Sequence, residues 1–297
     1  MDYSRAPDGT DGKTSSPLKL MCILAHPDDE SMGTGGILAR YAAEGVETHL
    51  VTATRGERGW QGPPEQNPGP GALGRLREGE LRAAARVLGL RTLEFLDYID
   101  GELDRADPVE ATAKLVAHVR RVRPQVVVTF GPEGAYGHPD HIAMSQLTAA
   151  AILAAADPDF ASDHRMPAHR VAKLYFLALT RPLVAAFLSV VGDMVIAVDG
   201  VQRCPVPWED WAITTRVDAE AYWQIAWQAV ACHRSQLAGL DIRRILDDVH
   251  RRLWGQPTFY RALSLVNGGR QIEHDLFEGL RQPDRIPSPA RVHGIMA

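Results

Sequence analysis

The amino-acid sequence predicts an α/β fold: a Rossmann-like, mostly parallel sheet with helices on both faces, followed by a less regular C-terminal portion. First, short apolar runs alternate with longer amphipathic runs up to about residue 157, as in successive β-α units. Second, the apolar runs are nearly continuous, which is typical of parallel strands covered on both faces. Third, this alternation loosens beyond residue 157.

The pattern of apolar residues first predicts a β-α-β unit. Residues 18–25 read as a buried strand, residues 31–44 as a helix that ends at Gly45, and residues 47–54 as a second strand. The glycine-rich run from Gly33 to Gly36 lacks the G-x-G-x-x-G spacing of a dinucleotide-binding loop. We therefore interpret these glycines as sites where a helix packs closely on the sheet.

A loop rich in glycine and proline follows over residues 59–74, and we interpret it as a mobile lid. Beyond it the pattern predicts helices at 75–90, 107–123 and 139–156, with strands at 92–97 and 125–130 between them. Asp107 is suited to the N-cap of the second of these helices, because Pro108 fits the first turn. The order of elements again predicts a parallel sheet.

The chain divides into three parts on this pattern. Residues 1–17 are polar and lack the apolar core of a signal peptide, so we expect a disordered lead-in. Residues 18–157 form the α/β core. Residues 158–297 are expected to complete the sheet and the pocket, with strands at 172–179 and 194–200, a helix at 219–233 and a polar tail from about 280.

Composition limits the partners of this 297-residue chain. Its formal net charge is -5 and it has no dense basic run, which argues against a nucleic-acid partner. The most apolar later stretch, residues 183–198, is interrupted by Gly192 and Asp193 and is short for a membrane span. Three cysteines do not suggest a disulfide framework. We expect a cytoplasmic protein without a membrane span, and the oligomeric state stays open.

A cluster of charged side chains follows the first predicted strand. His26, Asp28, Asp29 and Glu30 lie where an open α/β sheet presents the crevice at its carboxyl edge. Three carboxylates facing one cleft would repel one another, and a divalent cation would neutralise them. The alternative is that the acids merely cap the helix that follows, where negative charge suits the macrodipole.

A second cluster, from His138 to His141 with the sequence His-Pro-Asp-His, follows the strand predicted at 125–130. Two such clusters at one edge of a sheet are not explained by capping alone. Histidine and aspartate from one loop and histidine from the other give three ligands and leave one position for water, as in a catalytic zinc site. Spacing does not choose between His138 and His141, or between Asp28 and Asp29.

The runs AHPDDESMGTGG and GHPDH resemble the LmbE-like or PIG-L family of de-N-acetylases. This family includes the N-acetylglucosaminyl-phosphatidylinositol deacetylase and the deacetylase of mycothiol synthesis. The resemblance covers roughly residues 18–145, and it is weaker at the run His-Arg-Ser-Gln over 233–236. It implies a hydrolase that acts on a small-molecule amino sugar.

The resemblance also implies a role for each residue of the two clusters. His26, Asp29 and His141 would hold the metal, which we expect to be Zn2+, with Fe2+ as the alternative. Asp28 would be the general base. His138, in its protonated form, would stabilise the charge that develops on the carbonyl oxygen. Either Asp28 or His138 could protonate the departing amine.

Three further residues resemble positions that contact the substrate in this family. Arg77 and Asp100 would grip sugar hydroxyls, and Tyr136 would turn toward the substrate oxygen. The segment around Glu57 also matches the family, but Arg58 stands where the deacetylase of mycothiol synthesis has an acidic residue. This departure argues against an identical substrate.

Three functions are therefore considered. The first is zinc-dependent removal of an N-acetyl group from an amino sugar or its glycoside. The second is a metal-dependent amidase acting on a larger acyl group or a thiol conjugate. The third is a metal- or ligand-binding module without turnover, against which Asp28 argues, because a site that only binds metal needs no carboxylate beside its ligands.

Overall fold

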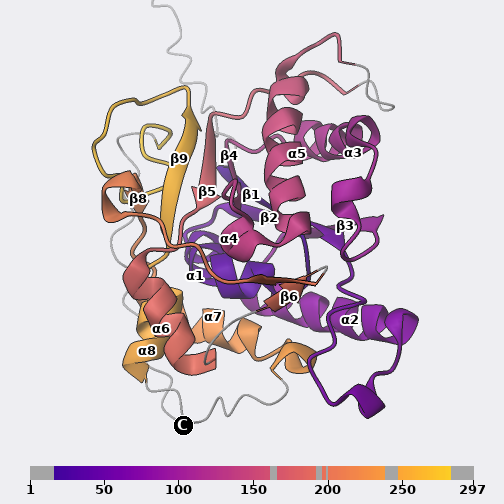
Figure 1. Cartoon of the computed structure of the whole chain (residues 1–297). Coiled ribbons are helices and arrows are strands. Elements are labelled where there is room, and N and C mark those ends of the chain that lie inside the picture. Colours follow the sequence, from indigo (N-terminus) through magenta and orange to yellow (C-terminus); the bar gives the residue numbers. More distant parts are fainter. Residues whose placement is uncertain (1–16, 161–165, 192–195, 199, 238–246, 282–297) are drawn as a thin grey trace, which may run out of the picture.

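The computed structural model describes residues 17–160, 166–191, 196–198, 200–237 and 247–281. In these residues a seven-stranded sheet runs in the order β3-β2-β1-β4-β5-β9-β8 (Figure 1). The first five strands of this order are mutually parallel, whereas β9 is antiparallel to β5 and β8 is antiparallel to β9. The strands are β1 (Lys19–Leu24), β2 (Glu47–Thr54), β3 (Thr92–Tyr98), β4 (Val126–Phe130), β5 (Lys173–Leu177), β8 (Thr215–Arg216) and β9 (Thr258–Ser264).

Helices cover both faces of this sheet (Figure 1). Helices α3 and α5 pack against each other on one face, and α1, α2, α7 and α8 pack together on the other. The bounds are α1 (Asp29–Ala43), α2 (Pro70–Leu88), α3 (Pro108–Val122), α4 (Gly134–Gly137), α5 (Pro139–Ala156), α6 (Arg181–Val191), α7 (Trp223–Val230) and α8 (Asp247–Gly255). A separate hairpin consists of β6 (Ile196–Val198) and β7 (Val201–Arg203). The predicted α/β class with a mostly parallel sheet is confirmed.

The core is centred on β1, whose residues Leu20 to Leu24 are at most 1% exposed. The glycines of α1 allow close packing on the other elements. A Cβ atom on Gly36 would lie 2.1 Å from the carbonyl oxygen of Trp254, and one on Gly35 would lie 3.2 Å from the Cβ of Ala226. These glycines are packing positions, as predicted, but Gly35 and Gly36 face α7 and α8 and not the sheet, and it is Gly33 that faces Leu177 of β5.

Several predicted boundaries are wrong. The helix predicted at 75–90 already begins at Pro70, so it takes in the end of the predicted lid. The helix predicted at 219–233 is a 3-10 turn over Glu220–Tyr222 followed by α7. Proline fits the first turn of a helix, which explains the earlier start. The mobility of the lid itself stays a prediction.

The C-terminal portion contains elements that the sequence analysis does not predict: α6, α8, β8 and β9. Of the strand predicted at 194–200, β6 accounts for residues 196–198, while residues 194, 195 and 199 lie outside the described residues. Residues 1–16 and 282–297 also lie outside them. Among the helices that the structure describes, none is both long and apolar enough to cross a membrane.

The two histidine clusters lie at a topological switch point. Strands β1 and β4 are neighbours, but the chain continues from β1 to β2 on one side and from β4 to β5 on the other. In α/β proteins, ligands bind at the carboxyl ends of strands whose connections diverge in this way. The loops after β1 and after β4 both lie at this end of the sheet.

Candidate active site

His26 directly follows the first strand of the core and is 7% exposed. Its Nδ1 lies 3.1 Å from Nε2 of His141 and 3.7 Å from Oδ2 of Asp29. Its Nε2 lies 3.1 Å from a carboxylate oxygen of Asp100 and 3.1 Å from one of Asp140. Two carboxylates at Nε2 fix the ring proton there, which leaves the Nδ1 lone pair facing Asp29 and His141.

The predicted ligands His26, Asp29 and His141 lie close together. Nε2 of His141 lies 3.1 Å from Nδ1 of His26 and 3.5 Å from Oδ1 of Asp29, whereas the other carboxylate oxygen of Asp29, Oδ2, lies 3.7 Å from Nδ1 of His26. Tetrahedral zinc with ligand bonds of about 2.0–2.1 Å places its ligand atoms about 3.4 Å apart. Two imidazoles and one carboxylate are also a donor set that suits zinc.

Other groupings of ligand atoms are also present in the described residues. His26, His138 and His141 have ligand atoms within 4.8 Å of one another, and so do His26, Asp100 and Asp140. The second grouping uses Nε2 of His26, which already faces two carboxylates. The amides of Gly101 and Leu103 donate to the two oxygens of Asp140, at 2.7 and 3.1 Å, so this carboxylate orients the His26 ring and is itself fixed.

Burial changes the protonation of several of these side chains. It raises the pKa of Asp29 to about 7, and it also raises the pKa of Asp28. A cation beside them would counteract this effect. Burial is also the main cause that lowers the pKa of His141 well below its usual value, which keeps that imidazole in the neutral form that binds metals.

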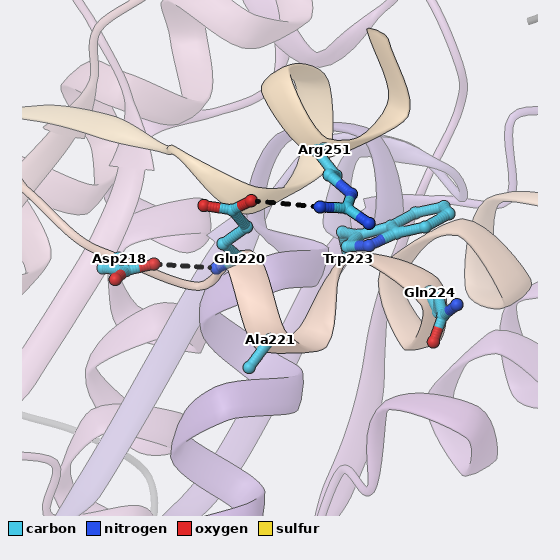
Figure 2. Close-up of a pocket in the computed structure, with 6 residues that line it drawn as sticks. All are labelled: Asp218, Glu220, Ala221, Trp223, Gln224 and Arg251. Carbon is cyan, nitrogen blue, oxygen red and sulfur yellow. Dashed lines mark hydrogen bonds and ion pairs between the residues drawn. The ribbon is translucent and has the colours of Figure 1, made fainter. Parts of the chain in front are cut away.

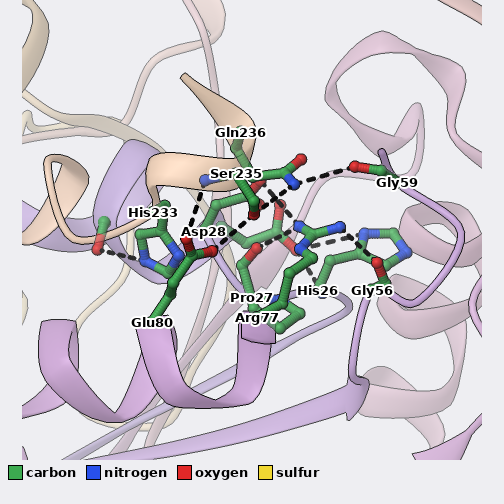
Figure 3. A network of polar contacts seen from close by, with 12 residues as sticks. His26, Pro27, Asp28, Gly56, Gly59, Arg77, Glu80, His233, Ser235 and Gln236 are labelled. Atoms are coloured by element: carbon green, nitrogen blue, oxygen red, sulfur yellow. Dashed lines mark hydrogen bonds and ion pairs between the residues drawn. The ribbon is translucent and has the colours of Figure 1, made fainter. Parts of the chain in front are cut away.

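Asp28 lies beside the three predicted ligands. It occupies the N-cap position of α1, but its side chain makes no capping hydrogen bond. Its carboxylate instead accepts a hydrogen bond from Nη2 of Arg77 at 3.1 Å (Figure 3). The acids of this cluster therefore do more than cap a helix.

Arg77 is 3% exposed, and its guanidinium also donates to the carbonyl oxygens of Gly56, at 2.8 Å, and Pro27. The structure thus places the Arg77 side chain against Asp28, where its hydrogen-bond partners are groups of the protein. Its predicted contact with the substrate stays a prediction.

His138 caps α5, because its Nδ1 accepts a hydrogen bond from the backbone N–H of Asp140 at 3.1 Å. An Nδ1 that accepts a hydrogen bond carries no proton, so the proton of the neutral ring is on Nε2. Burial is the main cause that lowers the pKa of His138 to about 4. The family resemblance implies a protonated His138, whereas this geometry favours the neutral form, with Nε2 as a hydrogen-bond donor.

Two further side chains lie near the two clusters: Tyr136, which is among the predicted residues, and Arg203, which is not. The Tyr136 ring centre lies 5.2 Å from that of His141 and 5.8 Å from that of His138. Arg203, in β7, approaches the same loop: a Cβ on Gly137 would lie 3.4 Å from its Nη1. Among the described residues, nothing accepts a hydrogen bond from its buried Nε. No local motif marks Arg203, since only the tertiary fold brings its hairpin to this loop.

Arg58, where the sequence departs from the family, lies near the predicted substrate contact Asp100. Its backbone N–H donates to Oδ2 of Asp100 at 3.0 Å, and its guanidinium donates to Glu102 at 2.6 Å. Asp100 is 6% exposed and is bonded to the protein through both oxygens. The structure thus places it as a partner of His26.

A separate pocket of about 440 Å³ is lined by Asp218, Glu220, Ala221, Trp223, Gln224 and Arg251 (Figure 2). Arg251 lies 3.6 Å from Glu220 and 6.0 Å from the Trp223 ring centre. None of the predicted catalytic, metal or substrate residues lines this pocket. The predicted site residues therefore lie elsewhere, at the carboxyl ends of β1 and β4.

Comparison with known proteins shows the family of this chain. Residues 21–152 match the model of the PIG-L family, described as GlcNAc-PI de-N-acetylase. A relative from Kineococcus radiotolerans is 34% identical over 90% of this chain and 84% of its own length, and one from Streptomyces avermitilis is 36% identical over 88% and 97%. Both are named 1D-myo-inositol 2-acetamido-2-deoxy-alpha-D-glucopyranoside deacetylase.

Among solved structures, a conserved protein of Thermus thermophilus superimposes with a TM-score of 0.61 at 29% identity, over 84% of this chain and 97% of that one. The fold and the sequence thus agree. On the fold and these relatives together, the chain is a hydrolase of N-acetyl amides and belongs to the PIG-L family of de-N-acetylases.

Proposed function

We propose that the chain is a zinc-dependent deacetylase that removes the N-acetyl group from an N-acetylglucosamine glycoside. The inositol glycoside in the names of the two relatives is the first candidate substrate. Because Arg58 departs from the mycothiol-pathway enzyme, glycosides with other aglycones belong in the same screen. The observation that carries the proposal is that His26, Asp29 and His141 converge while Asp28 is held beside them by Arg77.

In this proposal His26, Asp29 and His141 hold the metal. A zinc ion in such a site acts as a Lewis acid and lowers the pKa of water to about 7. Asp100 and Asp140 keep the His26 ring in the required orientation. Glu30, the third acid of the first cluster, is not a ligand, because both of its oxygens already bond to the protein.

The remaining steps belong to Asp28 and His138. Asp28 accepts a proton from the attacking water, with its carboxylate aimed by Arg77. Neutral His138 donates from Nε2 to the carbonyl oxygen as negative charge develops there. Since His138 carries no second proton, Asp28 returns its proton to the departing nitrogen, and the products are acetate and a free amine.

The amidase alternative uses the same catalytic residues and differs only in the acyl group that the pocket accepts. N-acetyl, N-propionyl and N-butyryl glucosamine glycosides distinguish the two functions. A deacetylase should lose turnover as the acyl chain lengthens, whereas an amidase for larger groups should gain it. Family membership favours either enzyme over a module that only binds a ligand.

The decisive experiment measures acetate release by the wild type, Asp28→Asn and Asp159→Asn. Asparagine keeps an oxygen for Arg77 but cannot accept the proton, so we expect a loss of about 10²–10⁴-fold in kcat with the zinc content retained. Asp159 is exposed, and its variant should match the wild type. An Asp28→Asn enzyme with wild-type turnover would falsify this assignment of the base.

The metal is tested on the same wild-type protein. Removal of metal with a chelator should abolish acetate release, and zinc should restore it. If ferrous iron restores a higher rate than zinc under anaerobic conditions, iron is the working metal. Full activity of the metal-free protein would contradict any role of His26, Asp29 and His141 as catalytic metal ligands.

A further inference from the structure

The backbone of Asp28 adopts a conformation that side-chain-bearing residues rarely adopt, with φ 119° and ψ -30°. Such a conformation persists only where its surroundings hold it, and it is often found at functional sites. The Asp28 carbonyl oxygen accepts from the amides of Ser31 and Met32 at 3.0 and 2.9 Å. Its N–H donates to Oε2 of Glu30 at 3.0 Å. The position of the Asp28 carboxylate therefore depends on Glu30 as well as on Arg77.

Glu30 is 1% exposed, and its second oxygen, Oε1, lies 2.7 Å from Nε2 of His233. The hydroxyl of Ser31 also donates to this oxygen. His233 is itself fully buried. A buried carboxylate must be paired, so His233 keeps Glu30 in the orientation that receives the Asp28 N–H.

His233 reaches this point because the residues after it are anchored to two other parts of the protein (Figure 3). The N–H and hydroxyl of Ser235 donate to the two oxygens of Glu80, on α2, at 2.8 and 2.6 Å. The Gln236 side chain donates to the carbonyl oxygen of Gly59 at 2.9 Å. The segment 233–236 thus joins α1, α2 and the loop at Gly59, and its histidine points at Glu30.

We propose that His233 is a positioning residue for the catalytic base: through Glu30 it holds the backbone of Asp28 in its strained conformation and so aims the carboxylate. The inference rests on the proposed function, in which Asp28 is the base. His233 touches neither substrate nor metal in this account. Its loss should therefore lower kcat and leave both KM and metal content unchanged.

Two amide substitutions separate this role from a general effect on folding. The side-chain nitrogen of glutamine takes the place of Nε2 and can still donate to Glu30, whereas the shorter asparagine places its nitrogen near Nδ1 and cannot. We expect His233→Asn to lower kcat about 100-fold, as a small misplacement of a catalytic group does. His233→Gln should recover most of the rate.

A matched control is His250→Gln. His250 is also a buried histidine of the C-terminal portion, where it packs against Trp223 and Trp227 and accepts from the indole N–H of Trp254. None of these contacts involves the first cluster, so the kcat of this variant should equal that of the wild type. If His233→Asn and His233→Gln have equal kcat, or if KM or zinc content changes in place of kcat, the positioning role is wrong.

A double-mutant cycle separates this inference from the proposed function. In the Asp28→Ala background, His233→Asn should cause no further loss, because a positioning residue acts only through the group that it positions. A further loss of similar size would overturn the inference and leave Asp28 as the base. If Asp28→Ala alone retains full turnover, the proposed function fails, whatever His233 does.

Discussion

The two ring nitrogens of His26 face different side chains, and in the proposed site this leaves Nδ1 free to bind the metal. Nδ1 faces Asp29 and His141, while Nε2 faces two buried carboxylates, Asp100 and Asp140. A carboxylate that accepts the second ring N–H of a metal-binding histidine fixes its tautomer and makes the ligating nitrogen more basic. Asp140 should therefore contribute to metal affinity although it is not itself among the proposed ligands.

Replacing Asp140 with asparagine should weaken zinc binding about 10–100-fold. The amide retains only one acceptor oxygen, whereas the native carboxylate serves His26 and the amides of Gly101 and Leu103 together. Competition with a chromophoric chelator measures the affinity, and Asp159→Asn is the control. An unchanged zinc affinity would show that the orientation of His26 does not depend on Asp140.

At the scale of single residues, the sequence could predict that the two clusters lie together, but not the protonation of their side chains. The two clusters could be placed together because each follows a buried parallel strand, and such strands end at one edge of the sheet. The tautomer of His138 could not be predicted, because it depends on the backbone N–H of Asp140. The hydrogen bonds of Arg77 behind Asp28 likewise depend on the position of α2.

Among the elements, α1 packs closely on α7 and α8, because Gly35 and Gly36 face them. Gly36 meets the backbone at the end of α8, where a Cβ would lie 2.1 Å from the Trp254 oxygen. Gly79, in α2, is also helical, but a Cβ there would meet nothing within 4 Å. The same substitution should therefore have opposite effects at the two positions.

Gly36→Ala should destabilise the fold by about 1–3 kcal/mol, because the backbone of α8 must move to admit the methyl group. Gly79→Ala should stabilise it by about 0.5–1 kcal/mol, because alanine loses less conformational entropy in a helix. The free energy of unfolding in urea measures both effects. Equal effects at the two positions would mean that the backbone of α8 can move away from α1 without a loss in the free energy of unfolding.

The predictability of the elements follows their dependence on tertiary contacts. The first three strands and α1, α3 and α5 have strong periodicity and clear end signals, so the sequence predicts them closely. Strand β8 has only two residues and is defined by its pairing with β9. Helix α8 is short and is held by Trp254 and Leu253 in a small second core. Such elements carry little local signal.

Across the whole molecule, a buried ionic network closes the antiparallel side of the sheet around Glu273, which is 1% exposed. Its carboxylate is bonded by Lys173, Tyr175, Thr215, Arg261 and Asn267. These side chains come from β5, β8, β9 and the segment after it. One carboxylate therefore joins the parallel part of the sheet to its last strands.

Stability should depend on pH through Glu273. Burial raises its pKa, but the hydrogen bonds of Lys173, Tyr175 and Asn267 outweigh burial and lower the pKa to about 2. In the unfolded chain a glutamate has a pKa of about 4.3. The folded state thus binds fewer protons, so this contribution to stability is complete above about pH 4.3 and is lost as the pH falls toward 2.

Glu273→Gln should destabilise the fold at pH 7 by about 3–5 kcal/mol, because it leaves Lys173 buried without its counter-charge. The difference from the wild type should shrink as the pH is lowered below about 4, since protonation of Glu273 then has the same effect. Unfolding free energies across this range measure the trend, with the exposed Glu278→Gln as control. A difference independent of pH would contradict the role of the Glu273 charge.

His233 lies far along the sequence from the residues that it is proposed to position, and this bears on the synthesis of the protein. All of the proposed metal ligands, together with Asp28 and His138, have been translated once residue 141 leaves the ribosome, but His233 follows much later. In the proposed mechanism, a nascent chain would thus contain every metal ligand before it contains the residue that aims its base. We expect catalysis only after the segment 233–236 has docked, so that truncated chains bind metal without consuming substrate.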